Sequence, residues 1–359
     1  MFVGTHCLAR IHLIAIETIY MGKTTSLLLA GFLTGVLATT FGLSFLLKYK
    51  PVGTSAANAS TTLKLGHSLP TTHLVHKSIE KMKSELETLS GGTMTIDIYP
   101  SSVLGPEEEC IEQLQNGSLA MTKTSAGALE GFVPEMAVFG LPYLFRDEAH
   151  FWQVLRGDIG KSLLKKGQSK FVLGLCFYDA GSRNFYTKDR PIKTPEDLAK
   201  MKIRVMNSAT AMDMVEAFGA SPTPISSGEL YTALAQGTVD GAENNLPTFT
   251  SNKHYEVCKH FSLDAHSRVP DMLLIGTSAW NQLSQQQQQW LAQAADVSAK
   301  FQRDLWAEET LAARKLAESK GVTVYDVKVA DFAARVKMMH DTVESEELKK
   351  LLNQIKDVK

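Results

Sequence analysis

The chain has 359 residues, more than a single domain usually holds, so two lobes are expected. Its composition is that of an ordinary globular protein, with 44% hydrophobic residues, 21% charged residues and a formal net charge of -1. A nucleic-acid-binding protein normally carries a basic face or domain, so no nucleic-acid partner is expected.

The first 60 residues are predicted to direct the chain out of the cytoplasm rather than to join the fold. A basic start at Lys23 precedes an almost uncharged stretch, Ser26 to Leu47, which is the pattern of an export signal. That stretch also approaches the length that spans a bilayer. Two outcomes stay open: cleavage near residues 57–59, or retention as a membrane anchor. Both place the folded part in the periplasm, and residues 1–60 then form an export signal or anchor with a linker.

From Leu63 onward, short apolar runs alternate with amphipathic stretches, which predicts an α/β fold. The predicted strands are Leu63–His67, Met94–Pro100, Phe171–Tyr178, Lys202–Val205 and Met272–Thr277. Helices are predicted at His76–Leu89, at Pro106–Gln115, from Thr194 onward and at Ser284–Lys320. A helix as long as the last one is expected to run between the lobes or across both.

The four cysteines give no sign of a disulfide framework or a zinc site. Cys7, Cys110, Cys176 and Cys258 form no CxxC pair and no cluster with zinc-ligand spacing. Cys7 falls in the export segment, so an odd number remains. Buried free thiols are therefore expected.

The sequence holds no motif of a known catalytic centre: no GxSxG elbow, no phosphate-binding P-loop and no HExxH pair. His67, His73 and His76 lack a cysteine or carboxylate partner at helical spacing, so no metal site is predicted. His73 follows the first predicted strand and is a candidate donor to a ligand hydroxyl, because open α/β sheets bind ligands in such loops. Neither an enzyme nor a cofactor is expected.

Two arginines are candidates for binding an acid. Arg183 follows a predicted strand and a glycine turn, and Arg204 lies in a short alternating strand whose apolar neighbours face the core. A guanidinium group matches both oxygens of a carboxylate, although such arginines also serve as solvated side chains or in structural ion pairs. Asn244 follows a glycine turn and either presents its amide to a ligand or belongs to the cap of the next helix.

Several ordered segments resemble the solute-binding proteins of TRAP transporters, a family of periplasmic receptors for organic acids. The resemblance runs from about Leu63 to the C-terminus. Its main segments are Tyr99–Gly105, Gln113–Leu119, Phe139–Phe145, Lys202–Val205, Gly219–Pro224 and Gly237–Asn244. It implies two α/β lobes joined by crossing strands, a hinge, a long helix across both lobes, and membrane permease subunits as partners. We assign residues 61–180 with 270–308 to lobe I and residues 181–269 with 309–359 to lobe II.

The resemblance also implies roles for individual residues. Arg204 corresponds to the arginine that clamps the substrate carboxylate, Arg183 to the second arginine, and Asn244 to the asparagine of the site. Asn207, just beyond the Arg204 strand, is added to the predicted site.

The substrate class implied is a sugar acid such as a hexuronate. Asp179 and Arg183 stand in a D-x-G-x-R-x-F-Y pattern of such binders. Glu107 and Glu109 hold the acidic position, although residues 107–109 also suit the first turn of a helix. A carboxylate there accepts hydrogen bonds from sugar hydroxyls and repels a second acid group. Ser227 replaces an aromatic ring of some relatives, and Ser125 replaces a glutamate of sialic-acid binders. C4-dicarboxylate, 2-oxo acid or sialic acid binding, and a ligand-sensing module, remain alternatives.

Overall fold

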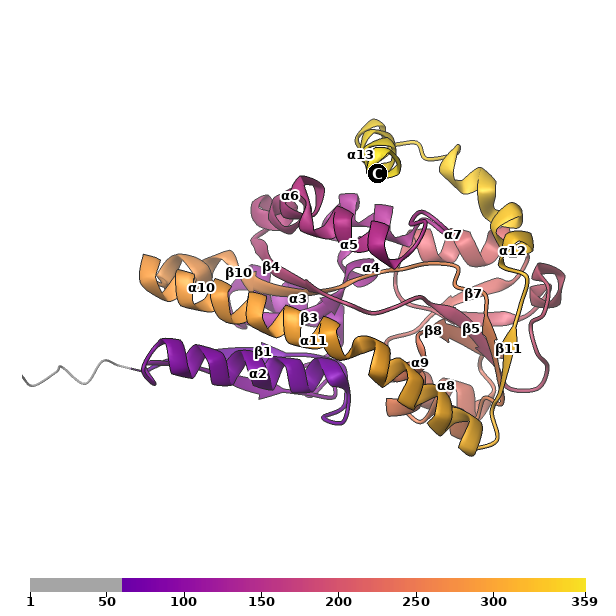
Figure 1. The fold of residues 1–359 in the computed structure, drawn as a ribbon, viewed down its shortest axis with the longest axis horizontal. Coiled ribbons are helices and arrows are strands. Elements are labelled where there is room, and N and C mark those ends of the chain that lie inside the picture. Colours follow the sequence, from indigo (N-terminus) through magenta and orange to yellow (C-terminus); the bar gives the residue numbers. More distant parts are fainter. Residues whose placement is uncertain (1–59) are drawn as a thin grey trace, which may run out of the picture. The chain divides into compact units, whose positions relative to one another are not determined.

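The structure is a computed structural model that describes residues 60–359 (Figure 1). The predicted export segment and Cys7 lie outside the described residues. Between Ser60 and Lys359, no helix is both long enough and apolar enough to cross a bilayer.

The first of two sheets in the described part has five strands in the order β2-β1-β3-β10-β4. Its strands are β1 (Thr61–Gly66), β2 (Met94–Tyr99), β3 (Met121–Ser125), β4 (Val172–Tyr178) and β10 (Asp271–Gly276). Strand β1 pairs in parallel with β2 and β3, whereas β10 runs antiparallel between β3 and β4. The accompanying helices are α2 (Leu74–Leu89), α3 (Glu107–Asn116), α4 (Ala126–Leu129), η1 (Pro134–Gly140), α5 (Glu148–Arg156), α6 (Asp158–Lys166), η2 (Gly167–Lys170) and α10 (Thr277–Gln282).

The second sheet has six strands in the order β11-β9-β5-β8-β6-β7 within the same residues. Its strands are β5 (Asn184–Thr187), β6 (Lys202–Val205), β7 (Ser221–Pro224), β8 (Gly241–Asn244), β9 (His260–Leu263) and β11 (Thr323–Asp326). Here β5 is the antiparallel strand, between β8 and β9. Its helices are η3 (Pro195–Leu198), α7 (Ala209–Ala217), α8 (Leu230–Gln236), α9 (Leu246–Ser251), η4 (His254–Glu256), α12 (Val329–Val336) and η5 (Lys337–His340).

Both sheets are buried on both faces because their strands are apolar at consecutive positions. Successive side chains of a strand point to opposite faces. Leu273 of β10 therefore joins one core while Leu274 joins the other, and Phe185 and Tyr186 of β5 divide in the same way. Apolar packing on each side of a sheet is what α/β folds require.

The long helix α11 (Gln285–Ser319) confirms the prediction of an element that spans both lobes. Its first half packs Leu291 and Ala295 against the core of the first sheet. Its second half packs Ala313 and Ala317 against the core of the second sheet. Figure 1 shows the helix lying along α2 and continuing past α9.

Two linkers carry the chain between the sheets, and they pair with one another. Residues 179–183 join β4 to β5, and residues 264–270 join β9 to β10. The Arg183 amide donates a hydrogen bond of 2.8 Å to the Ser267 carbonyl oxygen. This pairing places Arg183 at the crossing, where both lobes meet.

The C-terminal segment crosses between the lobes once more. Phe332 of α12 packs in a core of the second sheet, but Ile355 of α13 (Glu346–Asp357) packs in a core of the first. The assignment of all residues 309–359 to lobe II is therefore wrong for α13, because its apolar face covers the first sheet. The remaining lobe boundaries stay a prediction.

The predicted elements agree closely with the structure. Strand β1 begins two residues earlier than predicted because Thr61 and Thr62 pair with β2. The three cysteines of the described residues are free and buried, as expected.

Candidate functional site

Polar side chains from both sheets line a cavity beside the crossing linkers, which we call the inner cavity. The lobe of the first sheet contributes Ser68, Glu107, Lys123, Ser125 and Asp271. The lobe of the second sheet and its linker contribute Arg183, Arg204, Met206, Ser227, Asn244 and Thr248. Four of the seven predicted site residues, Arg204, Arg183, Asn244 and Glu107, are thus brought together here.

Arg204 is a buried cation in this cavity without a carboxylate beside it. It lies on β6 and is 4% exposed. Its Nε donates a hydrogen bond of 2.8 Å to the Ile225 carbonyl oxygen, which fixes the plane of the guanidinium group. Among residues 60–359, its terminal nitrogens have no hydrogen-bond partner and the group has no ion-pair partner. Burial lowers the pKa of Arg204 from its usual range, yet an arginine keeps its charge. A ligand carboxylate is the group that this fork would accept.

Arg183 is held by Glu243 and has less freedom than Arg204. Its Nε donates to one carboxylate oxygen of Glu243, and its Nη2 donates to the other at 2.8 Å. His266 lies between Glu243 and Asp264, at 3.4 and 2.6 Å. Burial opposes a charged ring, but the two carboxylates outweigh it and raise the pKa of His266 to about 9. The imidazolium therefore supports Glu243, which in turn orients Arg183.

Lys123 is the third buried cation that borders the cavity. Its Nζ lies 3.1 Å from a carboxylate oxygen of Glu107 and 3.1 Å from one of Asp271. Burial disfavours the ammonium, but these two carboxylates raise the pKa of Lys123 above its usual range. Glu107 also accepts hydrogen bonds from the Ser68 hydroxyl and the Ser125 amide. Ammonium and carboxylates together offer both donors and acceptors to ligand hydroxyls.

Asn244 keeps its predicted place, with its side-chain oxygen accepting from Arg183 Nη1 at 3.2 Å and from the Asn245 amide at 2.8 Å. The alternative reading as a helix cap belongs to Asn245, whose side chain accepts from the Thr248 amide at the start of α9.

His73 is not among the residues that line the inner cavity, and its predicted donation to a ligand stays a prediction. Its Nδ1 caps α2 by accepting from the Val75 amide at 3.1 Å. Burial, helped by the nearby Lys123, lowers the pKa of His73 to about 3, so the ring is neutral. Its Nε2 therefore donates to the Thr248 hydroxyl at 3.3 Å, and Thr248 takes its place at the cavity.

Asp179 is also placed away from the inner cavity. Its carboxylate accepts from the Gly181 amide at 2.7 Å and from the Trp152 indole at 3.2 Å, so it shapes the crossing linker. Its backbone amide donates to the side-chain oxygen of Gln302 on α11, and its carbonyl oxygen accepts from the side-chain nitrogen of Gln302, both at 2.8 Å. These contacts occupy the Asp179 carboxylate in the structure, and its role in ligand binding stays a prediction.

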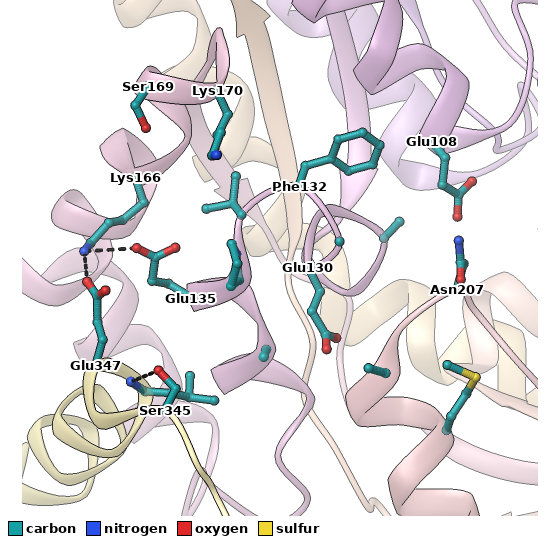
Figure 2. Close-up of a pocket in the computed structure, with 18 of the residues that line it drawn as sticks. Glu108, Glu130, Phe132, Glu135, Lys166, Ser169, Lys170, Asn207, Ser345 and Glu347 are labelled. Carbon is teal, nitrogen blue, oxygen red and sulfur yellow. Dashed lines mark hydrogen bonds and ion pairs between the residues drawn. The ribbon is translucent and has the colours of Figure 1, made fainter.

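Asn207 lies in a second, outer pocket of about 810 Å³ rather than in the inner cavity. In Figure 2, Asn207 and Glu108 point toward one another across this pocket. Met206 rather than Asn207 lines the inner cavity after β6, and the ligand contact of Asn207 stays a prediction.

The family of bacterial extracellular solute-binding proteins, family 7, matches residues 65–349. The chain belongs to that family. The resemblance to TRAP solute-binding proteins and the two-lobed α/β fold are both confirmed.

Three relatives of this family-7 protein illustrate the similarity. A solute-binding protein of Chromohalobacter salexigens is 32% identical over 284 residues, 78% of this chain and 84% of the relative. A TRAP periplasmic solute-binding protein of Xanthobacter autotrophicus, solved with β-D-galacturonate, is 36% identical with a TM-score of 0.80, and the match covers 83% of this chain and 100% of that one. A TRAP periplasmic protein of Polaromonas, solved with D-erythronate, is 34% identical with a TM-score of 0.81, over 84% and 99% of the two chains.

Sequence reasoning missed Lys123 and Asp271. The signal was present for Lys123, because it is the one charged residue of the buried strand β3, where a charge needs a partner. Asp271 opens the apolar strand β10 in the same way. That these two strands are neighbours, and so bring Lys123 and Asp271 together, is evident only from the sheet order.

Proposed function

We propose that this chain is the periplasmic binding subunit of a TRAP transporter and captures a sugar acid, a hexuronate or a related aldonate, for its membrane permease. The observation that carries the proposal is Arg204, a buried guanidinium group in the inner cavity without a carboxylate partner among residues 60–359. A bound carboxylate would supply the missing partner through two parallel hydrogen bonds. Arg183 and Asn244 lie beside it and would orient the same group.

The rest of the cavity supports a polyhydroxylated ligand. Glu107 and Asp271 accept hydrogen bonds from hydroxyl groups, and Lys123 donates to them. A second carboxylate on the ligand would meet these two acids, which disfavours C4-dicarboxylates. The galacturonate and D-erythronate found in solved relatives are acids of the favoured class. Binding rather than turnover is the proposed activity.

The test is a titration of the purified full chain with D-galacturonate, D-glucuronate, D-erythronate, succinate and N-acetylneuraminate. Sugar acids are expected to bind and to raise the melting temperature with concentration, and to be recovered unchanged. Arg204→Ala should weaken binding roughly 30-fold to several-thousand-fold, because losing one partner of a buried charge pair costs about 2–5 kcal/mol. Arg204→Lys keeps the positive charge but not the planar pair of donors, so its affinity should lie between those of the parent and Arg204→Ala.

A matched control is Arg314→Ala, which removes an arginine that pairs with Glu318 on the outer surface of α11. It should leave affinity unchanged. Equal affinities of the parent and Arg204→Ala would show that the carboxylate is held elsewhere, and binding of succinate alone would overturn the sugar-acid class.

A further inference from the structure

The first lobe has a groove along the free side of β4, which we call the edge groove. It has a volume of about 360 Å³. Leu175, Cys176 and Phe177 of β4 line it, with α5 and α6 on one side and α11 on the other. Figure 1 shows β4 between α6 and α11. Within residues 60–359, the edge groove shares no lining residue with the inner cavity or the outer pocket.

Strand β4 ends its sheet without the charge or proline that such strands usually carry. One side of β4 pairs with β10, and between Ser60 and Lys359 no strand pairs with the other side. Charges, prolines and bulges at end strands keep further strands away. Among the other end strands, β2 has Asp97, β7 has Pro222 and β11 has Asp326. Strand β4 has only a bulge, so its outer backbone groups are open to a further strand.

The end of β4 shows what this edge binds. The side-chain oxygen of Gln302 accepts from the Asp179 amide, and the side-chain nitrogen of Gln302 donates to the Asp179 carbonyl oxygen, both at 2.8 Å. An added strand would make the same pair of bonds. Phe177 is two residues earlier, so its amide and carbonyl groups point to the same side as those of Asp179, toward the groove that Phe177 lines.

The rim of the edge groove is basic. Its charged lining residues, within the described part of the chain, are one acid, Asp296, and four cations: Arg156, Lys161, Lys300 and Arg303. The guanidinium groups of Arg156 and Arg303 lie 5.7 and 5.1 Å from the centroid of the Trp152 ring. Among residues 60–359, Arg303 has a carboxylate oxygen only at 3.9 Å, from Asp304, and Arg156 has none within 4 Å. Burial, and then the charge of Arg156, lower the pKa of Arg303.

These features select the chemistry of an occupant. Two like charges held at one ring repel one another, and an added carboxylate would offset that repulsion. Below the rim, Leu164 and Leu175 are half-buried and would pack against an apolar side chain. The helices on both sides leave room for one extended segment, but they obstruct the approach of a whole sheet from a second copy.

We propose that the edge groove binds an extended acidic segment of a partner protein, which adds as a strand to β4 and places carboxylates at Arg156 and Arg303. Main-chain hydrogen bonds to the strand would supply affinity, and the basic rim would supply specificity. This binding does not depend on the ligand of the inner cavity.

The first experiment compares peptides on the full chain. The probe is a fluorescently labelled pentapeptide, blocked at both ends, with three valines between two glutamates, and anisotropy measures its binding at low ionic strength. The parent should bind it with a Kd of about 1 mM or lower. A peptide with lysines in place of the glutamates should bind at least roughly tenfold more weakly, because it meets the four cations. Methylation of the three valine nitrogens should weaken binding to a similar degree, because it removes the donors to β4.

Charge reversal locates the binding surface. Arg156→Glu combined with Arg303→Glu should weaken binding of the glutamate peptide at least roughly tenfold. The matched control is Lys315→Glu combined with Lys320→Glu, which changes the net charge equally at exposed positions, the nearer one about 18 Å beyond Arg303 along α11. It should bind the peptide within about twofold of the parent. Melting temperatures close to that of the parent would show that both double variants fold.

The proposal is overturned if the glutamate peptide binds the parent no better than the lysine peptide or the methylated peptide does. These comparisons need no variant, so they hold even where a variant does not fold. Unchanged binding to the folded Arg156→Glu, Arg303→Glu variant would also overturn the proposal. Self-association of the parent that this variant abolishes would do the same, because a second copy would then be the occupant.

Discussion

Glu130 joins the two lobes beside the outer pocket, and its replacement by glutamine should weaken ligand binding. It directly follows α4, whose Leu129 packs in a core of the first sheet. Its carboxylate accepts from the Ser208 hydroxyl at 2.5 Å, the Thr210 amide at 3.1 Å and the Thr210 hydroxyl at 2.9 Å. Those residues begin α7, which packs on the second sheet. Separation of the lobes breaks all three contacts.

The expected loss of affinity follows from the interactions that glutamine can still make at position 130. Glu130→Gln preserves the shape but loses the charge, which is worth about 0.3–1 kcal/mol at a helix start, and it weakens hydrogen bonds that are roughly twice as strong when charged. For a half-buried group, the sum is about 1–2 kcal/mol. If the closed form binds the ligand, affinity should fall roughly 5- to 30-fold.

Calorimetric titration of the full chain with the sugar acid that binds best measures this change. Glu135→Gln is the control, because Glu135 lines the same pocket but pairs with Lys166, on the same lobe. It should leave affinity within about twofold of the parent, a difference of roughly 0.4 kcal/mol. The reasoning is refuted if Glu130→Gln binds as tightly as Glu135→Gln.

Two further predictions concern stability. Lys123→Met leaves Glu107 and Asp271 buried without their cation and should lower the free energy of unfolding, measured in urea, by roughly 3–5 kcal/mol. The control Lys300→Met, on the surface of α11, should change that free energy little. Equal losses in the two variants would contradict the role of Lys123. The pKa of His266 is raised to about 9 from an ordinary 6.5, so its contribution to stability is complete below pH 6.5 and is lost as the pH rises through about 9. The parent melting temperature should therefore fall more over this range than that of His266→Gln, and parallel curves would contradict the raised pKa.

The secondary structure was predictable because its signals are local. The alternation at Met94–Tyr99, the proline-led acidic start of α3 and the uninterrupted run of α11 each depend on neighbouring residues only. Sheet order depends on distant pairing, and α13 shows the consequence. Nothing in its sequence says that its apolar face returns to the first sheet.

The residues that line the inner cavity were predictable only in part. Local context made Arg204, Arg183 and Asn244 candidates, and the family resemblance gave each of them a role; all three line the inner cavity. His73 and Asp179 lie outside the inner cavity because polar side chains near strand ends also serve backbone amides, and here they cap α2 and shape the crossing linker. Whether such a side chain binds a backbone amide or a ligand depends on the segment that packs against it, and that segment is distant in the sequence.

The threading of the chain bears on when the first lobe can be completed. Strand β10 lies between β3 and β4, and Ile355 closes one of the same cores. A ribosome must therefore have synthesised nearly the whole chain before that core can close, because its buried residues span positions 110 to 355. Contacts so far apart in sequence form slowly. A nascent chain of this kind is expected to keep its first lobe open until late in synthesis.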